Sequence, residues 1–247
     1  MSKAVVFMGW KDAPHLSAEA QEALLASYSP HERDARTKGI PQLGSGAIYP
    51  VPESEITCKP FDLPAYWPRG YGMDVGWNRT AAVWGAHDRD ADVVYLYSEH
   101  YRGNAEPSIH AEAIRSRGVW MPGVIDPASR SRGQRDGEQL LNDYVQLGLN
   151  LNTAQNAREA GLLEVWQRLS TGRLKVFDSL QSWLTEYRLY RRDEKGIVVK
   201  ERDHLMDATR YLVVSGIASM QLAPDYLQRL GHGAGVVSEY LPWEARA

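Results

Sequence analysis

Three strand-like runs follow one another in the middle of the sequence before any alternation with helices begins. They span Tyr71 to Gly76, Thr80 to His87 and Val93 to Tyr97, and they are rich in apolar, β-branched and aromatic residues. The polar turn Asp88-Arg89-Asp90-Ala91-Asp92 is suited to closing a hairpin between the last two runs. The order predicts three antiparallel strands, and it constrains the fold more than any other feature of the chain.

Helical and strand-like patterns alternate after these three runs. The spacing of apolar residues predicts helices at Pro107 to Arg117, Gly137 to Leu147, Glu159 to Ser170 and Arg202 to about Gly216, and strands at Val119 to Ile125 and near Leu149 to Leu151. A hairpin is predicted from Tyr187 to Arg192 and Ile197 to Lys200 around a polar turn. Together these elements predict an α/β fold of the RNase H-like (RuvC-type) class, a mixed sheet flanked by helices.

The two ends of the chain have a different character. Ala4 to Met8 predicts a short strand, Ala18 to Ser27 and Pro30 to Lys38 predict helices, and the proline-rich stretch from Ile40 to Pro68 predicts an irregular connector with a short strand at Ala47 to Val51. We therefore expect a helical and linker segment at 1–46, the RNase H-like domain at 47–218 and a tail at 219–247. Pro224 and the glycines after it predict a tail that is poorly ordered or serves as a partner-binding arm.

Composition excludes several classes of protein. With 43% hydrophobic and 24% charged residues, the chain is typical of a soluble globular protein. It has no apolar run long enough for a membrane span and no signal peptide, so a cytosolic protein is expected. Cys58 is the single cysteine, which excludes an intrachain disulfide and a thiolate zinc site. A net charge of -3 argues against nonspecific coating of nucleic acid but permits a local basic groove.

Three aspartates stand where aspartate is unfavourable. Asp74 lies inside the first predicted core strand, where this residue type is disfavoured. Asp126 ends the apolar run at Val124 and Ile125, and sheets of this kind bind ligands at such strand ends. Asp207 has apolar neighbours on a helix expected to pack on the sheet. Each alone is better explained by a turn cap or a salt bridge, but three in this strand, strand, helix order are not, and an unpaired buried carboxylate is costly and needs a cation or strong donors.

Carboxylates that meet in this way favour a divalent metal. Oxygen ligands suit Mg²⁺ or Mn²⁺ rather than zinc, and two such ions, roughly 3.5 to 4 Å apart, can activate water and stabilise the leaving oxygen of a phosphodiester. Asp203 lies one helical turn before Asp207 and is a candidate auxiliary ligand. Its alternative role is that of an acidic residue stabilised by the helix dipole.

Three motifs centred on these aspartates resemble the nuclease motifs of tailed-phage terminase large subunits. They are Gly72-Met73-Asp74-Val75-Gly76-Trp77, Val124-Ile125-Asp126-Pro127 and Lys200-Glu201-Arg202-Asp203-His204-Leu205-Met206-Asp207-Ala208-Thr209-Arg210-Tyr211. Residues 39–50 are similar to the segment that joins the packaging ATPase to its nuclease, so 1–46 resembles a remnant of that connecting region. The resemblance extends from Pro14 to about Gly216, and the last motif is its most specific part.

This resemblance implies a metal-dependent endonuclease that cuts concatemeric double-stranded viral DNA during genome packaging. It implies that Asp74, Asp126 and Asp207 bind two Mg²⁺ or Mn²⁺ ions, that the ATPase domain, the portal protein and the small terminase subunit are partners, and that the protein acts in the cytoplasm of the infected or lysogenic bacterial host. Two departures stand out. No Gly-x-x-x-x-Gly-Lys-Ser/Thr phosphate loop occurs, so this chain cannot drive translocation alone, and His204 stands where the family often has an acidic residue.

Basic residues near the motifs are candidates for phosphate contacts. They are Arg130, Arg132, Arg135, Arg188, Arg191, Arg192, Lys195, Lys200 and Arg202. For the group around the predicted hairpin, a solvated face mixed with acidic residues is an equal alternative.

Two other functions remain open at this stage. Asp74-Val75-Gly76-Trp77-Asn78-Arg79-Thr80 also resembles the phosphate loop of sugar kinases and actin-like ATPases, although those proteins usually contain two such halves. The chain could also be a non-catalytic docking module of the packaging motor.

Overall fold

The fold is a mixed sheet with helices on both faces, seen in a computed structural model that describes residues 10, 16–27, 37, 46–76, 78–126, 136–155 and 157–232. In chain order its elements are α1 (Ala18–Ser27), α3 (Glu53–Ile56), β1 (Thr57–Cys58), β2 (Arg69–Asp74), β3 (Thr80–Asp88), β4 (Val93–Arg102), α4 (Pro107–Arg115), β5 (Gly123–Ile125), α5 (Asp136–Gln146), β6 (Leu151–Thr153), α6 (Arg158–Ser170), β7 (Leu174–Phe177), α7 (Gln181–Leu189), α8 (His204–Tyr211), the π-helical turn η4 (Leu212–Gly216), the 3-10 turn η5 (Ile217–Ser219) and α9 (Pro224–His232).

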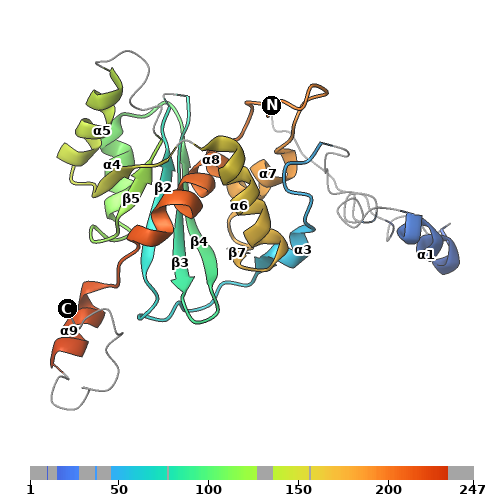
Figure 1. Cartoon of the computed structure of the whole chain (residues 1–247), viewed down its shortest axis with the longest axis horizontal. Coiled ribbons are helices and arrows are strands. Elements are labelled where there is room, and N and C mark those ends of the chain that lie inside the picture. The colour runs from blue at the N-terminus through green and yellow to red at the C-terminus, as the bar shows by residue number, and fades with distance from the viewer. Residues whose placement is uncertain are drawn as a thin grey trace, which may run out of the picture.

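The seven strands lie in the order β1-β7-β4-β3-β2-β5-β6. The meander β2-β3-β4 is antiparallel, as the three consecutive strand-like runs predict, and the remaining neighbours pair in parallel. Parallel pairing requires a crossover through a helix, which explains the alternation of helices and strands after β4. The predicted RNase H-like class, a mixed sheet flanked by helices, is therefore confirmed (Figure 1).

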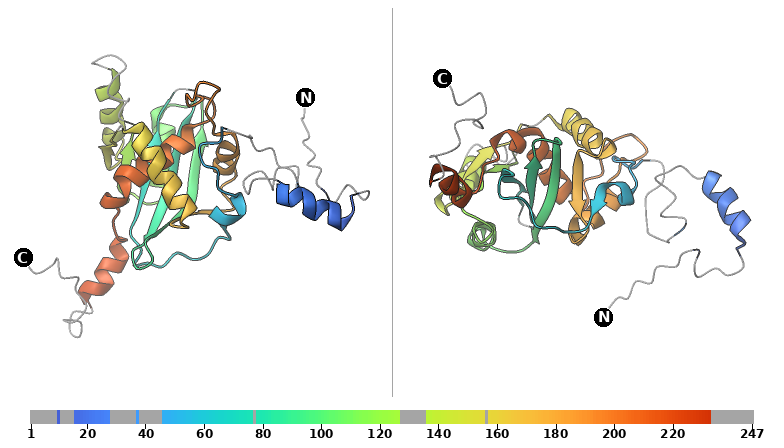
Figure 2. Two further views of the ribbon diagram at one scale, coloured as in Figure 1. Left: turned by 45° about the vertical axis from the view of Figure 1, so that its right-hand side comes forward. Right: turned by 90° about the horizontal axis from the view of Figure 1, so that it is seen from below.

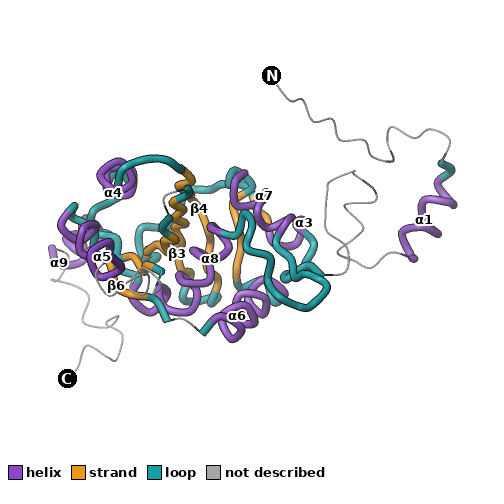
Figure 3. Tube along the Cα trace, turned by 90° about the horizontal axis from the view of Figure 1, so that it is seen from above, coloured by secondary structure: helices purple, strands orange, loops and turns teal. Residues whose placement is uncertain are grey.

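Alternate residues of the central strands supply two separate cores. Ala81 and Val83 of β3 pack with buried residues of α6, α7 and α8 on one face of the sheet. Ala82 and Trp84 pack with α4 and α5 on the other. Figures 2 and 3 show the same layers from other sides, with the strands running between the two groups of helices. None of the helices in the described ranges is long and apolar enough to cross a membrane.

Several predicted elements differ from the structure. Residues 47–51 form a single bridge from Ala47 to Arg191 instead of a strand, and the strand predicted from Val119 begins only at Gly123. The segment predicted as a strand from Tyr187 begins inside helix α7, so the expected hairpin is reduced to one bridge between Arg192 and Val198. Strand β7 and most of α7 were not predicted, and the tail contains helix α9. The elements predicted at 4–8 and, apart from residue 37, at 30–38 lie outside the described residues.

Candidate functional site

Asp74 and Asp126 lie at neighbouring strand ends. Strands β2 and β5 pair in parallel, with Met73 opposite Ile125. The residues that follow these two, Asp74 and Asp126, are therefore neighbours across the two strands. The backbone N–H of Asp126 donates to the carbonyl of Met73 at 3.1 Å, which continues the ladder past the end of β5. The two carboxylates therefore belong to one edge of the sheet, as expected for parallel strands.

Helix α8 brings Asp207 to the same edge because it packs unusually close to β2. A Cβ atom on Gly72 would lie only 2.1 Å from the carbonyl oxygen of Ala208, so only glycine permits this approach. Gly72 and Asp74 are two residues apart on a strand and therefore face the same side, toward the helix. Asp207 is 5% exposed and stands beside Ala208 in that contact.

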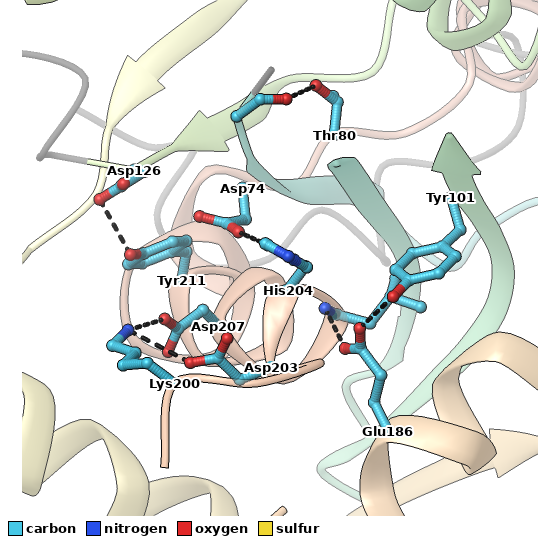
Figure 4. Close-up of polar contacts among 12 residues, drawn as sticks. Asp74, Thr80, Tyr101, Asp126, Glu186, Lys200, Asp203, His204, Asp207 and Tyr211 are labelled. Carbon is cyan, nitrogen blue, oxygen red and sulfur yellow. Dashed lines mark hydrogen bonds and ion pairs between the residues drawn. The ribbon is translucent and has the colours of Figure 1, made fainter. Parts of the chain in front are cut away.

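Each strand-end aspartate has a hydrogen-bond partner on α8 (Figure 4). Nδ1 of His204 lies 2.8 Å from Oδ2 of Asp74, and the hydroxyl of Tyr211 donates to Oδ1 of Asp126 at 2.9 Å. His204 and Tyr211 lie on either side of Asp207 along the helix, so one helix orients both neighbouring carboxylates. Sequence analysis gave neither residue a role, because their pairing depends on how the helix crosses the sheet.

Asp207 is surrounded by cations of its own chain. Its Oδ1 accepts from the buried guanidinium of Arg210 at 3.0 Å, and its Oδ2 lies 3.0 Å from Nζ of Lys200. The same ammonium lies 3.2 Å from Oδ2 of Asp203, which is also buried. Lys200 thus bridges two carboxylates, and Arg158 approaches the second at 3.9 Å.

The pKa values of these groups reflect mutual proximity. The pKa of Asp74 is raised to about 6, mainly by burial and in smaller part by the charges of Asp207 and Asp126, while the hydrogen bond with His204 opposes the rise. That hydrogen bond raises the pKa of His204 above its usual value. For Asp207, burial raises the pKa but Arg210 and Lys200 outweigh it, so the net shift is downward. The three aspartates therefore interact electrostatically as one acidic cluster.

Helix α8 is also fixed at its first turn by a buried carboxylate from α7. Oε2 of Glu186 accepts the backbone N–H of Leu205 at 2.6 Å, and Oε1 accepts the hydroxyl of Tyr101 at 2.7 Å. Glu186 is 1% exposed, and burial raises its pKa. It satisfies one of the N–H groups that a helix start leaves without a partner. The residue was missed because no helix was predicted at 181–189 and the strand predicted there begins only at Tyr187.

The predicted DNA-contacting residues fall into different environments. Lys200 lies within the acidic cluster. Arg188 forms a two-pronged ion pair with Glu53, and Arg192 pairs with Glu159, so both are engaged in structural contacts. Lys195 and Arg202 are exposed, and Arg191 is half-buried at the bridge to Ala47. Arg130, Arg132 and Arg135 lie outside the described residues.

The donor set of the cluster suits a hard divalent cation. It consists of carboxylates, the ligands that Mg²⁺ and Mn²⁺ prefer, and the buried Oδ2 of Asp203 has no hydrogen-bond donor among the described residues, Lys200 being its ionic partner. As the side chains stand, no three histidine, cysteine or acidic residues in the described part of the chain are arranged to hold one ion. Binding would therefore require local adjustment, and the assignment of Asp74, Asp126, Asp207 and the auxiliary Asp203 as ligands stays a prediction.

Comparison with known proteins gives a consistent result. Residues 71–215 match the family model described as Terminase RNaseH-like domain. Large terminase subunits of Enterobacteria phage LP7 and Salmonella phage P22 are each 36% identical over 221 residues, which is 85% of this chain but 46% and 44% of those proteins. The chain thus spans about half the length of these curated relatives.

Two solved structures agree with the observed fold. The nuclease domain of the P22 large terminase matches with a TM-score of 0.69 and 31% identity, over 74% of this chain and 97% of that one. A large terminase from a thermophilic bacteriophage matches with a TM-score of 0.60 over 84% of this chain and 55% of that one. At 20% identity, the second likeness concerns the fold alone.

Proposed function

Because the chain belongs to the terminase RNaseH-like domain family, whose model matches residues 71–215, we propose that it is an endonuclease that cuts double-stranded viral DNA during genome packaging. The observation that carries the proposal is the gathering of Asp74, Asp126 and Asp207 at one sheet edge. The match to a terminase nuclease domain over 97% of that domain supports it.

We assign the role of metal ligands to Asp74, Asp126 and Asp207, with Asp203 as an auxiliary ligand. Two Mg²⁺ or Mn²⁺ ions, when bound, would activate the attacking water and stabilise the leaving oxygen of the phosphodiester. The residues of this chain hold and orient the ligands: His204 fixes Asp74, Tyr211 fixes Asp126 and Arg210 fixes Asp207. Such outer partners commonly change metal affinity or activity by 10- to 100-fold when removed.

The remaining parts of the proposal concern the cell and the partners. Double-stranded DNA is the substrate, and exposed basic residues such as Arg202 and Lys195 contact its phosphates. A packaging ATPase, the portal protein and the small terminase subunit are the protein partners, and the bacterial host cytoplasm is the place of action. Since the chain spans about half of its relatives, the ATPase is supplied either by another part of a longer chain or by a separate protein.

The proposal is tested by nicking of supercoiled plasmid in Mn²⁺ or Mg²⁺. Asp74→Asn, Asp126→Asn and Asp207→Asn should each reduce the rate by more than about a hundredfold, because even the outer partners of metal ligands contribute 10- to 100-fold. Asp90→Asn, in the exposed turn between β3 and β4, is the matched control and should cut at the wild-type rate. Circular dichroism checks that all four fold. A variant that folds and still cuts at the wild-type rate loses its assigned role, and a wild-type protein that never cuts would favour a docking module.

A further inference from the structure

Most arginines in the described part of the chain are held by other protein groups. Seven form ion pairs with acidic residues: Arg158, Arg168, Arg173, Arg188, Arg192, Arg210 and Arg229. Arg79 and Arg202 form no ion pair with any described residue. Both stand at the sheet edge that carries the acidic cluster. Arg102 also lacks an ion pair with any described residue and ends β4 at this edge, but as the neighbour of Tyr101 on the strand it faces the opposite side of the sheet.

The position of Arg79 follows from strand register. Asp74 of β2 lies opposite Ala81 of β3, and Ala81 lies opposite Tyr101 of β4, so these three residues share the face covered by α8. Arg79 precedes Ala81 by two residues and lies just before β3 begins. Its guanidinium carbon lies 4.4 Å from the centre of the Tyr101 ring. Because strands are spaced about 4.8 Å apart, Tyr101 is only about two strand spacings from Asp74.

Tyr101 is a fixed platform for this arginine. Its hydroxyl donates to Glu186 at 2.7 Å, and burial is the main reason why its pKa is raised. Figure 4 shows Tyr101 and Glu186 beyond His204, on the side away from Asp126 and Tyr211. A guanidinium held over a fixed ring keeps its N–H donors available to a ligand, and it loses little conformational entropy on binding.

Arg202 adds a second cation on the same side. It is exposed, it lies just before α8, and its charge acts on Tyr101 together with that of Arg79. Its φ of +54° is in the left-handed region, an uncommon conformation for a residue other than glycine. A polyanion approaching the acidic cluster meets repulsion from Asp74, Asp126 and Asp207, so flanking cations are needed to hold it there.

We propose that Arg79, held over the ring of Tyr101, and Arg202 form a binding site for a backbone phosphate of DNA bound at the acidic cluster. Arginine matches phosphate geometry through paired N–H donors, and a contact of this kind reads no base sequence. The inference rests on the proposed nuclease function, since it places the DNA relative to the acidic cluster. It adds Arg79, a residue outside the basic groups that the sequence singles out.

The experiment measures binding of a short fluorescent DNA duplex by anisotropy, in EDTA and over a range of KCl concentrations. Arg79→Ala should bind roughly tenfold more weakly at low salt, as expected for loss of a charged hydrogen bond. The slope of log K against log salt should become shallower by about 1, because one phosphate contact is lost. Arg79→Lys should keep the slope while binding less tightly than wild type, since it retains the charge and loses the paired donors.

Arg115→Ala is the matched control. Arg115 is also exposed and without an ion pair among the described residues, but it ends α4 beside Gly148, at the opposite end of the sheet. It should bind with wild-type affinity and slope. If Arg79→Ala does the same, or if Arg115→Ala weakens binding equally, the proposed phosphate site is wrong.

Plasmid nicking in Mn²⁺ separates this inference from the proposed function. Arg79→Ala should raise KM and leave kcat nearly unchanged, because the contact is made equally in the ground and transition states. If wild type cuts and the aspartate variants do not, but Arg79→Ala matches wild type in binding and KM, only the phosphate site fails. If wild type binds DNA through Arg79 and never cuts, only the nuclease function fails.

Discussion

Replacing Gly72 by alanine tests how the acidic cluster is assembled. The new Cβ would lie 2.1 Å from the carbonyl oxygen of Ala208 and 2.9 Å from the amide nitrogen of Leu212. Carbon contacts are optimal at about 3.5 to 4.0 Å, so α8 must retreat by more than about 1 Å. Overpacking of a core typically costs about 1–3 kcal/mol. The upper end is expected here, since both obstacles are backbone atoms of one helix.

The displacement should reduce both stability and activity. For a domain of this size, 1 kcal/mol changes the melting temperature by about 2–4 °C, so a loss of roughly 6–12 °C is expected from 3 kcal/mol. Asp207 moves with the helix, and a misplacement of about 1 Å can reduce a catalytic rate about a hundredfold. Thermal unfolding followed by circular dichroism and plasmid nicking in Mn²⁺ measure the two effects.

Gly85→Ala is the matched control on β3. Its Cβ would also approach at 3.0 to 3.1 Å, but the atoms it meets are the ends of the Leu212, Met220 and Val94 side chains, which can turn aside. It should melt within a few degrees of wild type and cut at nearly the same rate. If Gly72→Ala melts and cuts like wild type, close helix packing does not position the cluster. If it loses stability and still cuts normally, Asp207 is not placed by this contact.

Three further outcomes follow from the structure. Burial and the neighbouring His110 lower the pKa of His100 to about 4, so between pH 6.5 and about 4 the unfolded chain takes up a proton that the folded chain does not. The free energy of unfolding should therefore fall by up to about 3 kcal/mol as the pH falls through this window. In His100→Gln, the plot of this free energy against pH should be flatter. Glu186→Gln removes one of two acceptors at Tyr101 and Leu205, and should lower the free energy of unfolding, measured in urea, by about 1–3 kcal/mol. EDTA should abolish nicking yet leave the melting temperature nearly unchanged, because Lys200, Arg210 and His204 already compensate the carboxylates; unfolding in EDTA would contradict this.

The central meander could be predicted from sequence because its signals are local. Strands β2 to β4 alternate between two cores, and short connections force neighbours to pair. The convergence of Asp74 and Asp126 could be expected from their places at strand ends. Their adjacency could not, since it depends on β5 crossing over through α4 to pair beside β2. The triad's ligand role itself stays a prediction.

Helix α7 shows why local patterns fail. Its residues Trp183, Thr185 and Tyr187 favour strands, and its tail was predicted as one. The helix is stabilised from outside: both carboxylate oxygens of Glu99, on β4, accept backbone N–H groups of Ser182 and Trp183. This cap comes from a strand more than eighty positions away, so the sequence around α7 does not reveal it. The tertiary contact therefore outweighs the strand propensity of these residues.

The roles of the basic residues were equally hidden. Charge and proximity to a motif suggested DNA contacts for Lys200, Arg188 and Arg192, yet each has an acidic partner in the fold. Arg79 was not among the predicted DNA contacts, because a single arginine between two strands forms no basic cluster. Whether an arginine is free for a ligand depends on which acids the fold brings near it, and that is a property of the structure.

The position of Asp207 is determined from two independent directions. Glu99 of β4 holds the start of α7, and Glu186 of α7 holds the start of α8, so the helix is linked to β4 by successive capping carboxylates. Gly72 of β2 meets the same helix one turn later, through backbone contact. A helix fixed at its start and at its middle cannot rotate without breaking one of these contacts. The scaffold, with Lys200 and Arg210, therefore opposes the mutual repulsion of the acids and holds their relative positions.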